Sequence, residues 1–272
     1  MSQTLARVLE VHPLAGLAWQ AAHEAAAFLV DERPDALVVE SKSTPTDAVT
    51  VMDRGAEQRI IERLLGARPD DGVLGEEGGE RTGTSGVRWI VDPLDGTVNY
   101  TYRIPAWGVS IAAEVDGAVQ VGVVVTPSLR SASIGIRGAG AWGLDDGALR
   151  SLRVSACTSL SAALVATGFG YHPQTRLAQG AAVSALLGTV RDIRRTGSAV
   201  VDFSWLARGW TDAYYESGLN VWDHAAGALI AREAGALVRG LDGPDHSKGV
   251  LVASTPGIAQ ELLDELRRVG AS

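Results

Sequence analysis

The sequence lacks the marks of several protein classes, and each absence excludes a kind of fold or function. Cys157 is the only cysteine, so neither an intrachain disulfide nor a zinc site built from several thiolates can form. A reducing cytoplasm is therefore the expected compartment. Residues 1–30 contain no basic start followed by a sustained apolar run. We therefore expect neither a signal peptide nor a membrane span.

Positive charge is also scarce. The chain carries 24 Lys and Arg residues against 32 Asp and Glu residues, which gives a formal net charge of −8 at pH 7. Such a field repels polyanions, so we expect no nucleic-acid partner and no contact with an anionic membrane. An anionic small molecule would need a local cation, and this requirement points to bound metal ions.

The chain is long and apolar enough to bury a large core. Its 272 residues are 46% hydrophobic and 21% charged, values typical of a folded globular protein. No linker, repeat or low-complexity segment divides the sequence. We therefore treat residues 1–272 as one unit with two subdomains, residues 1–155 and 156–272.

The first subdomain is predicted to combine two helices with an antiparallel sheet. Apolar residues at helical spacing predict one helix over 14–32 and a second that begins near Asp53 and closes at Gly66 and Pro69. Two later apolar runs flank Asp116-Gly117, a strong signal for a two-residue hairpin. The predicted strands are 109–115, 118–125, 131–136 and the region 138–143.

In the second subdomain, predicted strands and helices alternate. The predicted strands are 163–167, 190–193, 212–215 and 250–253. The predicted helices are 174–187, 199–207, 221–234 and 258–268. Alternation of this kind indicates an α/β arrangement, so the chain is expected to be α+β in its first half and α/β in its second.

The most informative stretch is residues 89–100. Its first three residues are apolar and predict the end of a buried strand, and an acidic turn follows. Pro93 fixes one backbone dihedral and donates no hydrogen bond, so Asp92, the Leu94 carbonyl and Asp95 can converge on one point. Three hard oxygen ligands within four residues suit Mg²⁺.

Gly96 and Thr97 follow directly. Their N–H groups would face an anion if a helix begins here, and glycine lets a ligand approach the backbone closely. The alternative is a loop in which Asp92 and Asp95 merely accept hydrogen bonds from turn and cap N–H groups. Partners elsewhere in the chain must decide between the two.

Three further acids lie at the boundaries of predicted elements. Asp53 begins a helix, Glu76 follows a short apolar run, and Asp223 opens an alanine-rich helix. Each has an ordinary explanation, because Asp53 suits a helix N-cap and adjacent surface acids such as Glu76 are usually only solvated. A metal site requires that they lie beside the Asp92 turn.

Taken together, these motifs resemble one family. They are Asp47-Ala48-Val49-Thr50-(x)₂-Asp53, Gly75-Glu76-Glu77, Asp92-Pro93-Leu94-Asp95-Gly96-Thr97-(x)-Asn99-Tyr100, Gly197-Ser198-Ala199 and Glu216-(x)₅-Trp222-Asp223-His224-Ala225-Ala226-Gly227. They are similar to the signatures of the inositol monophosphatase family, in its bacterial inositol-1-monophosphatase branch, within the Mg²⁺-dependent, Li⁺-sensitive phosphatases. The resemblance implies a layered α-β-α-β-α sandwich of the sugar-phosphatase type. The polar loop around Lys42 is similar to the family's mobile first loop.

The resemblance also implies two or three Mg²⁺ ions in the active site. Glu76, Asp92 and the Leu94 carbonyl would hold one ion, and Asp92, Asp95 and Asp223 would hold a second. A phosphate monoester carries about two negative charges at neutral pH. Cations must therefore neutralise both the ester and the carboxylates.

By the same resemblance, Thr97, oriented by Asp53, and Glu76 would position a water for attack on phosphorus, and no covalent phosphoenzyme is required. Further residues would bind the phosphate and the hydroxyl groups of the alcohol. These implied substrate-binding residues are Glu76, Leu94, Asp95, Gly96, Thr97, Gly197, Ser198, Ala199, Glu216 and Asp223.

Other phosphatase chemistries fail on the residues. An aspartyl nucleophile would need an Asp two residues before Asp95, where the chain has Pro93. A cysteine phosphatase needs its Cys in a loop that ends in Arg, and residues 158–163 after Cys157 contain none.

Inositol 1-phosphate, a small phosphorylated polyol, is the first substrate expected. Histidinol phosphate, fructose 1,6-bisphosphate and an adenosine bisphosphate are the alternatives. The family analogy predicts a homodimer. A hypothesis from another class is a regulatory binding protein of the transcription machinery.

Overall fold

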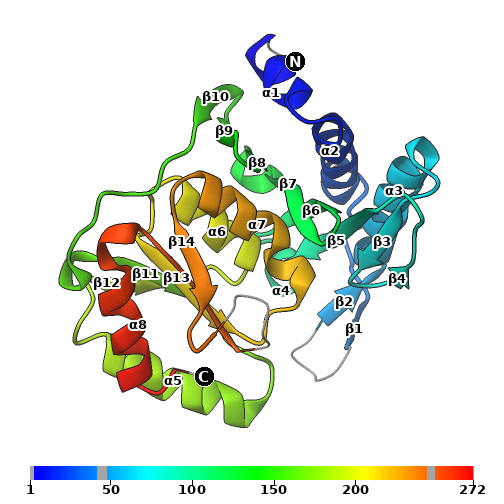
Figure 1. Ribbon diagram of the computed structural model, residues 1–272. Helices are drawn as coiled ribbons and strands as arrows, with labels where there is room; N and C mark the ends of the chain where they lie inside the picture. Colours follow the sequence, from blue (N-terminus) through cyan, green and yellow to red (C-terminus); the bar gives the residue numbers. More distant parts are fainter. Residues whose placement is uncertain (1–2, 42–47, 244–248, 272) are drawn as a thin grey trace.

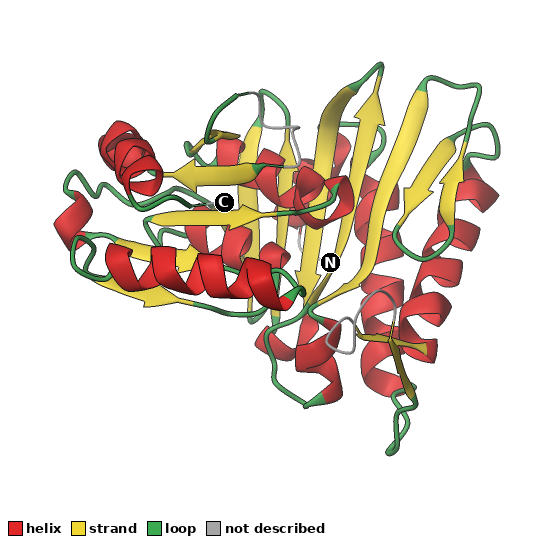
Figure 2. Ribbon diagram, turned by 90° about the horizontal axis from the view of Figure 1, so that it is seen from below, coloured by secondary structure: helices red, strands yellow, loops and turns green. Residues whose placement is uncertain are grey.

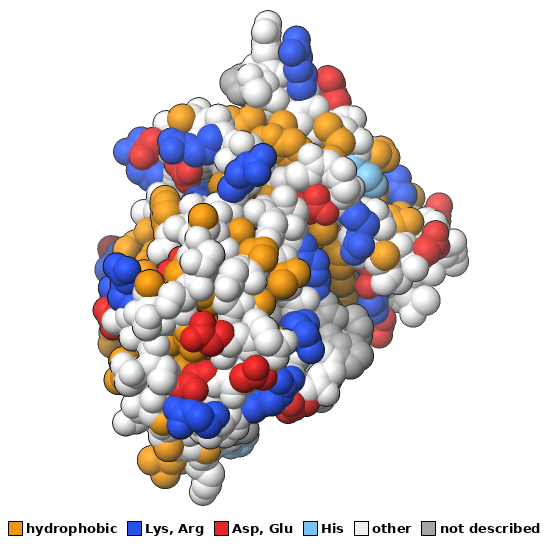
Figure 3. All heavy atoms as spheres, turned by 60° about the vertical axis from the view of Figure 1, so that its left-hand side comes forward, with side chains coloured by type: hydrophobic (Ala, Val, Ile, Leu, Met, Phe, Trp, Pro, Cys, Tyr) orange, Lys and Arg blue, Asp and Glu red, His pale blue; other side chains and the backbone are white. Residues whose placement is uncertain are grey.

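A computed structural model describes residues 3–41, 48–243 and 249–271. Asp47 and the loop around Lys42, both part of the sequence predictions, lie outside the described residues. Within the described part of the chain, no helix combines the length and the apolar character that crossing a membrane requires. Figure 3 shows Lys and Arg side chains interspersed with Asp and Glu side chains over the face that it presents.

The larger sheet carries most of the first half of the chain. Among the described residues it has eight strands in the order β10-β9-β8-β7-β6-β5-β3-β4. Its strands are β3 (Gly72–Gly75), β4 (Gly79–Arg81), β5 (Val87–Asp95), β6 (Gly108–Val115), β7 (Ala118–Thr126), β8 (Ser131–Ile136), β9 (Gly140–Asp145) and β10 (Ala148–Ser151). Neighbours are antiparallel except β3 and β5, which run parallel. The predicted hairpin is confirmed, because Asp116 and Gly117 both have positive φ angles, as a type I′ turn requires.

Helices from the beginning of the chain cover one face of this sheet. They are α1 (Gln3–Glu10), α2 (Ala15–Asp31) and α3 (Val51–Ala67), and a small pair of strands, β1 (Val39–Ser41) and β2 (Ala48–Thr50), joins α2 to α3. The alanine-rich side of α2 is buried and packs with Trp89 of β5 in one hydrophobic cluster. The predicted amphipathic helix is therefore a core element.

Two helices from the second half of the chain, α6 (Ala199–Ala207) and α7 (Val221–Glu233), cover the opposite face. Val200 of α6 and Ala226 of α7 share a hydrophobic cluster with Ile90 of β5 and Val124 of β7. The two halves of the chain are thus joined by a common core. The division into subdomains at residue 155 stays a prediction.

The smaller sheet lies beyond these helices. Within the described residues its order is β12-β11-β13-β15-β14. Its strands are β11 (Leu164–Thr167), β12 (Asp192–Arg194), β13 (Ala213–Ser217), β14 (Leu237–Gly240) and β15 (Val250–Ser254), and its outer helices are α5 (Pro173–Leu186) and α8 (Ala259–Arg268). β11 runs parallel to β12 and β13, whereas β15 is antiparallel to both β13 and β14.

The layers follow one another as helices, large sheet, helices, small sheet and helices (Figures 1 and 2). This order confirms the layered α-β-α-β-α sandwich. Helix α1 and the short strands β1, β2, β4 and β14 were not predicted.

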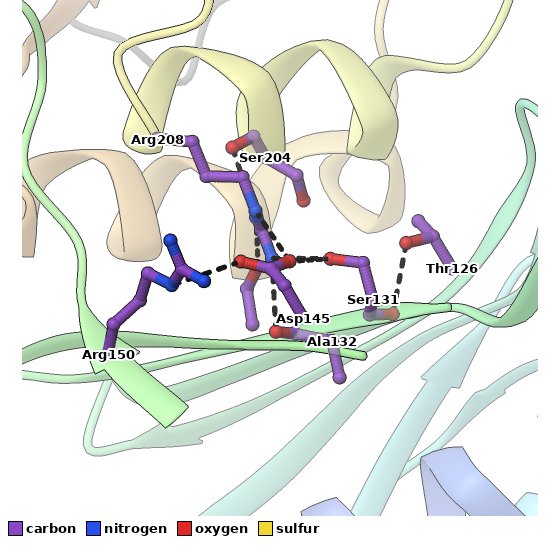
Figure 4. A network of polar contacts seen from close by, with 8 residues as sticks. Thr126, Ser131, Ala132, Asp145, Arg150, Ser204 and Arg208 are labelled. Carbon is purple, nitrogen blue, oxygen red and sulfur yellow. Dashed lines mark hydrogen bonds and ion pairs between the residues drawn. The ribbon is translucent and has the colours of Figure 1, made fainter. Parts of the chain in front are cut away.

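One buried polar network ties α6 to the large sheet (Figure 4). The Arg208 guanidinium, 3% exposed, follows the end of α6 and donates to Asp145 Oδ1 at 3.0 Å. It also donates to Ser133 Oγ at 2.7 Å and to Ser131 Oγ at 2.5 Å, both on β8. The network therefore pairs a buried cation with an acid and with neutral acceptors.

Candidate active site

The acidic turn predicted after residue 91 is instead the irregular end of strand β5, which continues to Asp95. Asp92 pairs with Ser110 and Asp95 pairs with Gly108, so three steps along β5 match two along β6 and the strand bulges between them. Pro93 cannot donate to the ladder, which favours a bulge here. The Leu94 N–H donates to Asp92 Oδ1 at 3.1 Å. The predicted turn was wrong because pairing with β6 resumes beyond the proline.

Asp92 is the most constrained of the predicted metal ligands. It is 1% exposed, and burial, followed by the negative charges of Glu76, Asp95 and Asp223, holds its pKa well above the usual range. The fold therefore brings these four acids, separated by up to 147 positions, into one electrostatic environment. Burial of like charges is costly unless a cation or a proton compensates them.

Asp95 joins the end of β5 to the start of α6. Its Oδ2 accepts hydrogen bonds from Ser198 Oγ at 2.6 Å and from the Val200 N–H at 2.8 Å. Burial raises the pKa of Asp95, while these donors and the Gly96 N–H favour its charged form. Ser198, predicted to bind substrate, is thus bonded to a predicted metal ligand, and it is also the N-cap of α6.

Asp223 lies in the first turn of α7, where its Oδ2 accepts from the Asn220 N–H at 2.6 Å. Burial and then the charges of Asp95 and Glu76 hold the pKa of Asp223 well above its usual range. Glu76 directly follows β3, the parallel neighbour of β5, and its N–H donates to the Val91 carbonyl at 3.3 Å. Two strand ends and one helix start thus carry the cluster.

The donor set fits Mg²⁺ in its chemistry, because it consists of four carboxylates and one carbonyl oxygen, and the described cation that acts on Asp95 is Arg195. As the side chains are placed, however, no group of three or more His, Cys, Asp or Glu residues in the described chain is arranged to hold a metal ion. Asp92, Asp95 and Asp223 each accept a hydrogen bond from a backbone N–H through one carboxylate oxygen. The fold gathers the acids without setting them at ligand distance from one point.

A chain of hydrogen bonds connects the predicted catalytic residues. Thr97 Oγ1 lies 2.8 Å from Asp53 Oδ1 and 3.1 Å from the Leu94 carbonyl oxygen. Asp53 Oδ2 accepts from both the N–H and the hydroxyl of Thr50. Asp53 is 1% exposed, and burial raises its pKa. Asp53 is the third helical residue and Thr50 the N-cap of α3, but the expected capping role of Asp53 is confirmed, because its side chain accepts from the Thr50 N–H in a capping box.

The predicted helix start at residues 96–97 is confirmed as α4 (Thr97–Thr101). Gly96 is its N-cap with φ +89°, a conformation that other residues rarely adopt. Asn99 Nδ2 donates to the Thr196 carbonyl at 2.8 Å and thereby ties α4 to the Gly197-Ser198-Ala199 motif. The Tyr100 hydroxyl donates to the Leu29 carbonyl at 2.7 Å. Asn99 and Tyr100 therefore anchor α4, the helix that begins at Thr97.

Glu216 lies on β13, on the side of the site formed by the small sheet. The Tyr214 hydroxyl donates to Glu216 Oε2 at 2.7 Å. Burial raises the pKa of Glu216 to about 7, and the negative charge of Asp95 contributes. The structure thus joins this residue electrostatically to the acid cluster around Asp92.

The sequence reasoning missed one acid in this part of the molecule. Asp202 of α6 is 1% exposed, and its Oδ1 has no hydrogen-bond partner among the residues that the structure describes. Burial holds its pKa well above the usual range, with further contributions from the charges of Glu216 and Asp95. The available signal was an acid inside the apolar run 199–203.

The chain is similar in sequence and in structure to several known proteins. The pattern of the inositol monophosphatase family matches residues 10–270. Inositol-1-monophosphatase of Mycobacterium leprae is 45% identical over 267 residues, which cover 91% of each chain. The Nus factor SuhB of Pasteurella multocida is 39% identical over 94% of this chain and 97% of its own. The crystal structure of the extragenic suppressor protein suhB from Bartonella henselae superposes with a TM-score of 0.88 at 35% identity, over 94% of this chain and 99% of that one.

Proposed function

Because the chain belongs to the inositol monophosphatase family and is therefore a phosphatase, we propose that it hydrolyses inositol 1-phosphate to myo-inositol and phosphate with Mg²⁺ as cofactor. The observation that carries this proposal is the cluster of Glu76, Asp92, Asp95 and Asp223, in which the neighbouring negative charges raise the pKa of Asp92 and of Asp223 and thereby favour binding of a cation. A substrate with about two negative charges enters such a site only with cations.

In this proposal Glu76, Asp92, Asp95, Asp223 and the Leu94 carbonyl would hold two or three Mg²⁺ ions. When bound, these ions would lower the pKa of a water and stabilise charge on the entering and departing oxygens. The protein supplies the positions of the oxygen ligands. It also supplies Thr97 as a group that would bind the water.

Thr97 is proposed to orient the attacking water. Its hydroxyl has one proton, and an ionised Asp53 at 2.8 Å is a stronger acceptor than the Leu94 carbonyl at 3.1 Å. With that proton directed to Asp53, a lone pair of Thr97 Oγ1 accepts a hydrogen bond from the attacking water, and Glu76 shares this role. The Leu94 carbonyl then remains available as a ligand.

The alcohol is proposed to lie between Gly197, Ser198 and Ala199 on one side and Glu216 and Asp223 on the other. Glu216 and Asp223 supply acceptors for hydroxyl protons. The phosphate would face the Gly96 and Thr97 end of α4.

Histidinol phosphate is the alternative substrate. The negative charge of Glu216 raises the pKa of Asp202 at the alcohol's side of the site, and acids there suit a cationic alcohol, whereas the positive charge of Arg195 lowers the pKa of both groups. The second phosphate of a bisphosphate would meet the same acids, which makes these substrates less suitable. Side-by-side kcat/KM values on the four esters, with and without Mg²⁺, test the proposal. A hundredfold preference for histidinol phosphate over inositol 1-phosphate would overturn the first choice.

A regulatory role in transcription is the alternative from another class, because the P. multocida relative is named a Nus factor. Asp95→Asn discriminates between the two in cells. If the variant complements a deletion fully, the hydrolytic role is secondary; if it fails while the protein is folded, hydrolysis is the role that matters. The cytoplasm as compartment and the homodimer remain proposals of the same kind.

A further inference from the structure

A buried acid outside the proposed metal set holds the turn that carries Glu76. Glu57 of α3 is 3% exposed. Its Oε2 accepts from the Glu77 N–H at 2.8 Å, and its Oε1 accepts from the Gly78 N–H at 2.7 Å. Both donors belong to residues 76–78, which connect β3 to β4. One carboxylate therefore fixes the backbone immediately after Glu76.

The glycines around this turn leave room for that carboxylate. A Cβ atom on Gly75 would lie 2.4 Å from Glu57 Oε1, and a Cβ atom on Gly78 would lie 2.6 Å from it. These distances are far below van der Waals contact. A side chain at either position would therefore displace Glu57 from the turn.

Helix α3 places two buried acids one turn apart. Asp53 and Glu57 are four residues apart, so they lie on the same side of the helix, together with the buried Ala56 and Ile60. Asp53 contacts Thr97, and Glu57 contacts the turn of Glu76. Thr97 and Glu76, which the proposed mechanism assigns to binding the water, are thus both positioned by helix α3.

We propose that Glu57 is a positioning residue that fixes Glu76 for binding of the divalent cation and the water. The inference rests on the proposed function, and it adds a residue that does not itself contact cation or substrate. A carboxylate suits this position because it offers an acceptor oxygen to each N–H. An amide would present its NH₂ group to one of the two donors.

Glu57→Gln tests the proposal while conserving side-chain volume. Loss of a group that orients a metal ligand typically weakens metal affinity or activity by about 10–100-fold. We expect a weakening in this range for the Mg²⁺ dissociation constant, measured by calorimetry without substrate, and a matching fall in kcat at saturating substrate. Glu62→Gln, on the exposed side of the same helix, is the matched control and should bind Mg²⁺ as the wild type does. Wild-type Mg²⁺ affinity in folded Glu57→Gln would overturn the inference.

Gly78→Ala is a second variant that leaves α3 untouched. Its added methyl group would push the Glu57 carboxylate away from the turn, so we expect the same loss of Mg²⁺ affinity as in Glu57→Gln. Should Glu57→Gln fail to fold, this variant carries the test alone. Unchanged Mg²⁺ affinity in Gly78→Ala would contradict the proposed role.

The double variant Glu57→Gln/Glu76→Gln separates positioning from an independent effect. If Glu57 acts through Glu76, the double variant should bind Mg²⁺ no more weakly than Glu76→Gln alone. Additive losses would overturn the inference and leave the proposed function intact. Wild-type affinity in Glu76→Gln itself would instead overturn the metal assignment, and the inference with it.

Discussion

Two buried charged clusters in this molecule differ in how their charge is compensated. The Arg208 network places a guanidinium against Asp145 and two serine hydroxyls, so every charge has an opposite or neutral partner (Figure 4). In the Asp92 cluster, acids raise one another's pKa. The first cluster is complete as a structural element, whereas the second keeps four acids beside Arg195, and a proton or a bound cation would compensate the excess negative charge.

The difference between the two clusters indicates which of them has a structural role and which binds a ligand. A balanced buried pair joins two layers of the fold, and its removal affects stability. An unbalanced cluster costs stability and is retained where a ligand uses it. The predictions below separate these two consequences.

The largest expected effect is on turnover in Asp92→Asn. Asp92 is proposed to contact more than one cation, so its loss should lower kcat/KM by about 10⁴-fold, in the range seen when a key catalytic group is removed. In metal-free buffer the variant should be at least as stable as the wild type, because a buried negative charge is gone. Steady-state kinetics and urea unfolding in chelator measure the two quantities. Activity near that of the wild type would refute the metal assignment.

Arg208→Met should show the opposite pattern. Removing the cation leaves Asp145 without its buried partner, and breaking such a pair typically costs about 3–5 kcal/mol. We expect the free energy of unfolding to fall by about this amount in urea titrations, while kcat/KM per folded molecule stays unchanged. A large loss of turnover in the folded variant would mean that the two clusters are not independent.

Thr97→Val should lower kcat by about 100-fold, the lower end for loss of a group that transfers or orients a proton. KM should change little, since valine preserves the shape of the side chain. Thr97→Ser keeps the hydroxyl and is the control expected to retain most activity. Wild-type kcat in Thr97→Val would contradict a role for the hydroxyl, and equal losses in the two variants would mean that the hydroxyl alone does not account for the effect.

The smallest effect concerns Glu216 and pH. Burial raises its pKa from 4.5 to about 7, so the folded protein binds more protons than the unfolded chain between these values. The free energy of unfolding contributed by Glu216 therefore falls as pH rises through this window. Glu216→Gln should gain stability over the wild type as pH rises from about 4.5 to about 8 in metal-free buffer. A stability difference that is independent of pH would contradict this environment.

Much of the fold followed from local sequence signals. The hairpin at Asp116-Gly117 and the helix 199–207 are observed where they were predicted. Turn residues and apolar periodicity act over a few positions, so they are visible in one sequence. The end of β5 was missed because its bulge depends on pairing with β6, which no local pattern contains.

The candidate site was predictable in its residue types and less so in its supports. The acids at 76, 92, 95 and 223 were recognised by motif. Glu57 and Asp202 were not, although each is an acid among mainly apolar buried residues of its helix. The link from Arg208 to Asp145 spans 63 positions and arises only when α6 packs on the large sheet. Contacts of this kind depend on the layers, and local periodicity does not encode them.

Anomalous diffraction from crystals soaked in Mn²⁺, at a concentration that supports full turnover, tests the central claim most directly. The account predicts one anomalous peak in contact with Glu76, Asp92 and the Leu94 carbonyl, and a second in contact with Asp92, Asp95 and Asp223. It also predicts that both peaks disappear in Asp92→Asn crystals. Active crystals without a peak at Asp92 would contradict the account.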